Sequence, residues 1–137
     1  MWRKVLTLGL GLALSIVIPT TCCWSACIQA DVGGTWRMYA VAADGYSSYY
    51  IYGSVQVQYN GVVNPGTILK NSRGDSFTVQ GGHVYVNPAC FISGHIDLSG
   101  GLTVYVTNGS LERDKCSFGA VWKNSQNEAG MATGVKK

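Results

Sequence analysis

Charged residues are scarce in this sequence, and the few that occur show almost no bias of sign. Only 12% of the 137 residues are Asp, Glu, Lys or Arg, which is too few for a highly charged disordered chain. Arg3 and Lys4 account for two of the ten basic residues, which leaves eight beyond residue 30 against seven acidic ones, a net charge of about +1. Because a nucleic-acid-binding protein needs a basic surface, we expect no nucleic-acid partner.

The sequence also lacks the short motifs of the common catalytic sites. It contains no Gly-x-Ser-x-Gly, no His-Glu-x-x-His and no phosphate-binding glycine loop. His95 and Asp97 lie two residues apart and therefore on one face of a strand, which we interpret as the solvated outer face. His83 and His95 do not have the close spacing of metal ligands. We therefore expect no enzyme, no cofactor and no metal site.

A long apolar stretch runs from Val5 to Ile18, directly after the basic residues Arg3 and Lys4. Its 14 residues fall short of the roughly 20 that a membrane-spanning helix needs. A basic flank, an apolar run and small residues in this order are typical of a secretory signal peptide. We expect residues 1–30 to be that signal peptide, without a transmembrane span, and residues 31–137 to form a single β-barrel domain.

The cleavage point has two candidates in the sequence. We expect cleavage after Ala30, and cleavage after Ala26 is the alternative. Small residues before Cys27 also raise a second alternative, in which Cys27 carries a lipid anchor, although Trp24 occupies the position where a bacterial lipobox has Leu. The expected location is secreted, extracellular or periplasmic, with lipid anchoring at the cell surface as the alternative.

Cysteine occurs at five positions, three of them before residue 30. If cleavage follows Ala30, only Cys90 and Cys116 remain. Two cysteines in a secreted domain most often form one disulfide, so we predict a bond between Cys90 and Cys116. Neither belongs to a Cys-x-x-Cys motif, which argues against thioredoxin-type redox chemistry.

Beyond residue 30, apolar residues alternate with polar ones, and no segment shows the apolar period of a helix. Glycine or Asn-Gly interrupts this alternation every 8 to 12 positions, a pattern typical of many short antiparallel strands. We predict an all-β fold, a small antiparallel up-and-down β-barrel or sandwich of eight or nine short strands. The expected strands span residues 35–42, 46–59, 67–70, 76–80, 83–86, 90–98, 102–107, 116–122 and 131–135.

Tyrosines crowd into one part of the sequence, at positions 39, 46, 49, 50, 52 and 59. If the strand is regular past Gly53, alternation turns Tyr50 and Tyr52 outward and Tyr49 and Tyr59 inward. Tyr50 and Tyr52 are therefore candidate contacts for a partner or ligand, because tyrosines on a rigid sheet bind with little loss of side-chain entropy. The alternative is that tyrosine simply suits strands.

Two short motifs are better explained as turns. Arg73-Gly74-Asp75 spells the tripeptide that integrins recognise, but Gly-Asp is ordinary turn chemistry. Asn108-Gly109-Ser110 is a glycosylation sequon that has meaning only in a eukaryotic host. We expect both segments to be turns.

Gly34-Thr35-Trp36, at the start of a series of short strands, resembles the opening of the calycin barrels, the lipocalin and avidin group. The resemblance implies that Trp36 packs across one end of a barrel. It brings no ligand residues with it, because the biotin-binding residues of avidin have no counterparts here. The expected function is a secreted, non-catalytic binding protein for a small ligand, glycan or protein partner. The alternative is a structural or assembly subunit of the cell surface or extracellular matrix.

Overall fold

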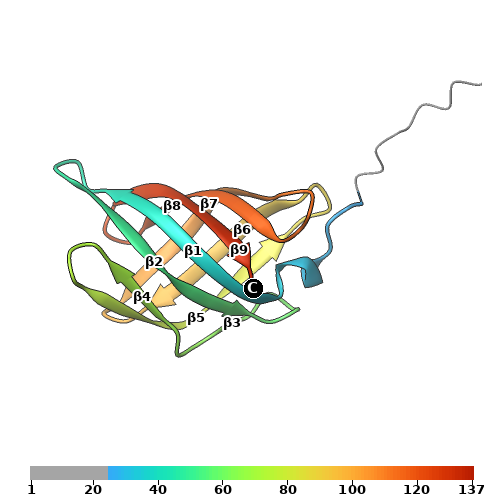
Figure 1. Cartoon of the computed structure of the whole chain (residues 1–137), viewed down its shortest axis with the longest axis horizontal. Helices are drawn as coiled ribbons and strands as arrows, with labels where there is room; N and C mark the ends of the chain where they lie inside the picture. The colour runs from blue at the N-terminus through green and yellow to red at the C-terminus, as the bar shows by residue number, and fades with distance from the viewer. Residues whose placement is uncertain (1–24) are drawn as a thin grey trace, which may run out of the picture.

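Alternating apolar and polar side chains form nine strands in the computed structural model, which describes residues 25–137 (Figure 1). Most of the expected signal peptide, residues 1–24, lies outside the described residues. A short 3-10 helix, η1 (Gln29–Val32), precedes the strands. The strands are β1 (Gly34–Ala43), β2 (Ser48–Val57), β3 (Val63–Asn64), β4 (Ile68–Asn71), β5 (Ser76–Val86), β6 (Phe91–Leu98), β7 (Leu102–Leu111), β8 (Ser117–Asn124) and β9 (Ala129–Lys136).

The strands form one antiparallel sheet that closes on itself. Their order is β1-β9-β8-β7-β6-β5-β4-β2-β3, and a further pairing of β1 with β2 completes the ring. β1 and β2 pair along their whole lengths, from Gly34 opposite Val57 to Ala43 opposite Ser48. The expected small up-and-down barrel is thereby confirmed, with β3 as a two-residue addition beside β2. Closure removes the free sheet edges through which a flat sheet would aggregate.

Two glycine-containing segments that the sequence predicts as turns lie inside strands instead. Gly81 and Gly82 belong to β5, where the register shifts by a bulge, so the expected strands 76–80 and 83–86 are one continuous strand. Gly82 allows β6 to approach closely, because a Cβ there would lie 2.3 Å from the carbonyl oxygen of His95. The sequon Asn108-Gly109-Ser110 likewise lies within β7 beside a second register shift. Bulges bend a strand where a barrel needs curvature.

The two ends of the barrel are built differently. Residues 25–33, the turns 87–90 and 112–116 and the last residues of β9 gather at one end, here called the closed end (Figure 1). The hairpin turns 44–47, 72–75, 99–101 and 125–128 gather at the other, here called the mouth. Within residues 25–137, no helix has the length and apolarity needed to cross a membrane.

The inward faces of the strands form the apolar core. Alternation places the inner side chains of β6 as the sequence predicts, since Ile92, Ile96 and Leu98 are buried. Val55 and Val79 are completely enclosed. The core does not fill the barrel to its rim, which leaves room for the cavity described next.

Candidate ligand cavity

A cavity of about 370 Å³ lies inside the barrel. Every strand of the ring contributes inward-facing side chains to its wall, and most of these side chains are apolar. Examples from around the ring are Trp36, Met38, Ile51, Phe77, Val104 and Phe118. Small-molecule sites are typically concave, largely apolar and about 300–1,000 Å³ in volume. The cavity therefore has the size and lining of a site for a small organic molecule.

Trp36 closes the cavity at the closed end. Its side chain is 4% exposed, and its Nε1 donates a hydrogen bond of 2.8 Å to the carbonyl oxygen of Val32. The ring packs edge-on against Phe118, with 5.4 Å between centroids, and the Nζ of Lys136 lies 4.9 Å from the ring centroid. The calycin resemblance implies a tryptophan across one end of the barrel, and the structure places Trp36 there.

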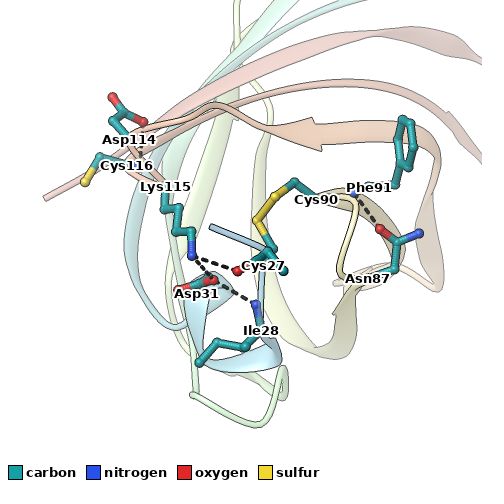
Figure 2. The surroundings of a disulfide bond; sticks show 10 residues. Cys27, Ile28, Asp31, Asn87, Cys90, Phe91, Asp114, Lys115 and Cys116 are labelled. Carbon is teal, nitrogen blue, oxygen red and sulfur yellow. Dashed lines mark hydrogen bonds and ion pairs between the residues drawn. A yellow bond between two sulfur atoms is a disulfide. The ribbon is translucent and has the colours of Figure 1, made fainter. Parts of the chain in front are cut away.

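The disulfide of the closed end corrects the pairing expected from the sequence. Cys90 is bonded to Cys27, with 5.1 Å between the Cα atoms, whereas Cys116 is exposed and unpaired (Figure 2). Cys90 adopts a positive φ of 66° after the Asn87-Pro88 turn and meets the N-terminal segment. Cys116 lies in a different turn, and its sulfur points away from the bond. Cleavage after Ala30 would place Cys27 in the removed leader, so that expectation leaves Cys116 as the only partner for Cys90.

Residues 25–33 are bound to the barrel by more than the disulfide. The side chain of Gln29 donates to the carbonyl oxygen of Val84 at 2.7 Å and accepts from the Val86 amide at 3.2 Å. Asp31 forms an ion pair of 2.9 Å with Lys115. Partial burial alone would raise the pKa of Asp31, but hydrogen bonds from the Ile28 amide and from Lys115 outweigh it and lower the pKa. This segment therefore forms a fixed floor under the cavity.

A chain of four side chains crosses one side of the mouth. Tyr49 points inward and donates its hydroxyl proton to Oε2 of Glu128 at 2.7 Å. The guanidinium carbon of Arg73 lies 4.1 Å from the centroid of the Tyr49 ring, and its Nη2 lies 3.0 Å from a carboxylate oxygen of Asp44. Burial, followed by the Glu128 carboxylate, raises the pKa of Tyr49 to about 12. Hydrogen bonds from the backbone amides of Ser47 and Tyr46, and then from Arg73, lower the pKa of Asp44 to about 2.

Two turns of the mouth share one arrangement that strand alternation alone does not reveal. Both read Asn-Ser-x-x-acid, from Asn71 to Asp75 and from Asn124 to Glu128. In each, the buried Asn accepts hydrogen bonds from the amides two and four residues further along. Its Nδ2 donates to the acidic side chain, at 2.9 Å in the first turn and 2.7 Å in the second. Asp75 of the integrin-like tripeptide is thus engaged within its own turn.

Trp122 contributes to the cavity wall below the second of these turns. Its side chain is 4% exposed, yet its Nε1 has no hydrogen-bond partner among residues 25–137. Gly130 on β9 makes room for the ring, because a Cβ there would lie 2.8 Å from Cζ2 of Trp122. A buried donor without an acceptor is rare in folded proteins.

The tyrosines of β2 divide between the two faces of the barrel. Tyr50 and Tyr52 point outward and are 57% and 41% exposed, with 6.1 Å between ring centroids, although Tyr52 also borders the cavity. Tyr49 points inward and lines the cavity. Tyr59, however, is 76% exposed, so its predicted inward position is wrong. β2 ends two residues before Tyr59, and alternation stops where the strand stops.

Exposed apolar side chains also form a row on the outside of four neighbouring strands. Val121, Met131, Val41 and Tyr50 are successive cross-strand neighbours on β8, β9, β1 and β2. Their exposed fractions are 43%, 68%, 57% and 57%. Cross-strand neighbours on one face lie in contact distance of each other. We call these four residues the outer row.

The histidines lie on the outside of the barrel as well. Nε2 of His95 lies 3.7 Å from a carboxylate oxygen of Asp97, and both side chains are about two-fifths exposed. Asp97 also accepts a hydrogen bond of 2.9 Å from the hydroxyl of Thr103. Among the described residues, no three His, Cys, Asp or Glu side chains gather as metal ligands.

Comparisons with known proteins identify the fold but not a family. No family model and no curated protein matches the sequence. A de novo designed fluorescence-activating β-barrel is 18% identical, covers 81% of this chain and 100% of its own, and has a TM-score of 0.61. The redesigned barrel mFAP1, bound to DFHBI, is 15% identical, covers 80% of this chain and 100% of its own, and has a TM-score of 0.63. The redesigned barrel mFAP0, also bound to DFHBI, is 16% identical, covers 77% of this chain and 99% of its own, and has a TM-score of 0.60. These likenesses support the antiparallel barrel and leave the calycin resemblance as a likeness of fold.

Proposed function

We propose that the protein is an exported, non-catalytic binding protein that holds a small, largely apolar ligand inside its barrel. The observation that carries this proposal is the apolar cavity, which is closed by Trp36 at one end and bordered by turns at the other. The designed barrels mFAP0 and mFAP1 bind DFHBI, so proteins of this fold can hold a small molecule.

The chemistry of the cavity wall favours binding over catalysis. Apolar burial supplies most of the affinity in such sites, while a few polar groups orient the ligand. The polar groups at the mouth are already engaged with one another: Tyr49 with Glu128, and Arg73 with Asp44. They are arranged to hold a molecule rather than to activate a nucleophile.

Export is supported by the disulfide between Cys27 and Cys90, since stable disulfides belong to oxidising compartments. The same bond bears on the cleavage point. Cleavage after Ala30 would remove Cys27 from the barrel, whereas cleavage after Ala26 would retain it. We therefore propose that cleavage follows Ala26 and that the product is soluble. Intact mass should show a chain that begins at Cys27, with one disulfide and no diacylglycerol. A chain that begins at Asp31, or an acylated Cys27, would contradict this.

The ligand proposal is tested by titration with a neutral, environment-sensitive dye such as N-phenyl-1-naphthylamine. The wild-type protein should bind one dye with saturation. Val104→Trp fills the cavity and should abolish saturable dye binding. Tyr105→Trp changes the neighbouring side chain, which points outward, and should leave dye binding intact. Circular dichroism and melting curves establish that both variants fold. Equal binding by both folded variants, or an absence of saturable binding, would refute the proposal.

A second candidate function, assembly with other copies or with a surface partner, is favoured by the outer row. Replacing Tyr50 and Tyr52 by Ser should change the free energy of unfolding by less than about 1 kcal/mol, because both are exposed. If the outer surface is the functional one, this double variant should lose partner capture or self-association measured by sedimentation. Val104→Trp should then have no effect on either.

A further inference from the structure

The charges around the mouth do not balance. Three carboxylates, on Asp44, Asp75 and Glu128, face one guanidinium, on Arg73. Arg73 is committed to Asp44 through an ion pair of 3.0 Å and also donates to the hydroxyl of Ser47. No Lys or Arg of residues 25–137 forms an ion pair with Asp75 or Glu128. Two negative charges at the edge of an apolar cavity are therefore left uncompensated.

Each of these two carboxylates retains unused accepting capacity. Oε2 of Glu128 accepts hydrogen bonds from Tyr49 and Asn124, both at 2.7 Å. Oδ2 of Asp75 accepts one from Asn71 at 2.9 Å. The second oxygen of each carboxylate accepts nothing from the described residues, and both residues line the cavity. The two Asn-Ser-x-x-acid turns, here called the twin turns, thus fix each carboxylate by one oxygen and leave the other oxygen free to accept a hydrogen bond.

The ring order sets these two carboxylates on opposite sides of the opening. The β4–β5 turn carries Asp75 and the β8–β9 turn carries Glu128, and the β1–β2 and β6–β7 turns separate them on either side. A group that enters the cavity through the mouth therefore passes between two acceptors.

A second observation points independently to a ligand in this half of the cavity. Trp122 lines the wall just below the turn that holds Glu128, and its buried Nε1 lacks an acceptor among the described residues. Buried polar groups are normally satisfied by protein, water or ligand. An acceptor atom on a bound molecule would complete this part of the wall.

We infer that the ligand is an amphiphile whose largely apolar body fills the barrel and carries one acceptor atom for Nε1 of Trp122, while its protonated amine lies in the mouth between Glu128 and Asp75. This inference rests on the proposed function, because it concerns the same cavity. An ammonium group offers up to three hydrogen-bond donors and one positive charge, which match two partly unsatisfied carboxylates. A carboxylate head would meet like charges unless Arg73 left Asp44, so discrimination between heads comes from repulsion as well as attraction.

The test compares three molecules with one ten-carbon chain and different heads: decylamine, decanol and decanoate. Each displaces the neutral dye from the wild-type protein at neutral pH. Decylamine should displace the dye at roughly tenfold lower concentration than decanoate, an interaction difference of about 1.4 kcal/mol, with decanol between them. Added salt should reduce the difference between the displacing concentrations of decylamine and decanoate, because the mouth is open to solvent and its charges are screened.

Matched variants assign the preference to the mouth. Glu128→Gln and Asp75→Asn keep the hydrogen-bonding shape of the twin turns and remove one charge each, so each should reduce the preference for decylamine severalfold. Asp97→Asn removes an exterior carboxylate that does not line the cavity and should leave the preference unchanged. Saturable dye binding with equal displacement by all three heads, or with decanoate as the best competitor, would overturn this inference while the proposed function stood. An absence of saturable dye binding by the wild-type protein would refute the proposed function instead.

Discussion

The closed end and the mouth of the barrel solve the same problem, that of terminating a ring of strands, by different means. At the closed end a disulfide, a buried indole and a buried Val32 fix a segment from outside the ring. At the mouth, tight hairpin turns are held by hydrogen bonds between polar side chains, of which only Asn71 and Asn124 are buried. The first arrangement is covalent and apolar, and the second is polar and open to water.

This difference indicates how stability and recognition are divided along the barrel axis. Buried apolar contacts and a cross-link contribute several kcal/mol, whereas exposed ion pairs contribute little. Substitutions at the closed end should therefore reduce the free energy of unfolding most. Substitutions at the mouth should mainly change what the cavity accepts. Four predictions test this division, in order of decreasing effect.

Trp36→Ala should have the largest effect. Removing a buried aromatic side chain costs about 3–5 kcal/mol of unfolding free energy, and here it also opens the floor of the cavity. Urea denaturation measures the loss. The matched control is Tyr46→Ala at the mouth, since Tyr46 is fully exposed and should change stability by less than about 0.5 kcal/mol. Equal stability of both variants would contradict the assignment of Trp36 to the closed end.

Cys27→Ser should have the next largest effect on stability. A disulfide between residues 63 positions apart restricts the unfolded chain and typically stabilises a domain by about 2–4 kcal/mol. Cys90→Ser should lower the melting temperature by a similar amount, and the double variant by no more than either single one. Cys116→Ser is the control and should leave the melting temperature unchanged. A large effect of Cys116→Ser would restore the pairing expected from the sequence.

Asn71→Ala should have an intermediate effect at the mouth. The substitution removes a buried amide that satisfies two backbone amides, and such a loss costs about 1–3 kcal/mol. Asn124→Ala should behave in the same way, because its turn has the same hydrogen bonds. Lys70→Ala, one residue away and exposed, provides the control in the denaturation experiment. A neutral Asn71→Ala would show that water replaces these bonds.

Tyr49 should give the smallest and most specific signal. Its pKa is raised from 10.0 to about 12, so the protonated form is favoured in the folded state. The associated stability is fully present below pH 10 and is lost as pH rises through about 12. Absorbance at 295 nm should show one tyrosine that ionises after the others, and Tyr49→Phe should remove that phase. If the late phase persists in Tyr49→Phe, another tyrosine is its source and the assignment to Tyr49 is wrong.

The division between the two ends also explains which features the sequence could predict. The inward side chains of β1 and β6 follow from alternation, which is a local property of each strand. The pairing of Cys27 with Cys90 is not local, because it depends on which turns share an end of the barrel. It also depends on a cleavage point that alternation says nothing about. Gly81 and Gly82 were misassigned because bulges and turns use the same residue.

The mouth was predictable in part. Its repeated Asn-Ser-x-x-acid pattern is visible in the sequence, and an Asn that binds its own turn is a known local preference. What could not be predicted is that Arg73, Tyr49 and Glu128 come from three different hairpins and meet. That contact exists only because the sheet closes into a ring.

Ring closure has a consequence for the order of folding. The seam joins β1 to β9, and Trp36 lies opposite Lys136, a hundred residues later in the chain. Contacts of such long sequence separation raise the contact order and slow folding, because loop closure must precede them. The barrel cannot close before β9 has been synthesised, so the edge of β1 that faces β9 stays unpaired until then. The nascent chain therefore keeps an open seam, and the export proposed above would have to take place before that seam closes.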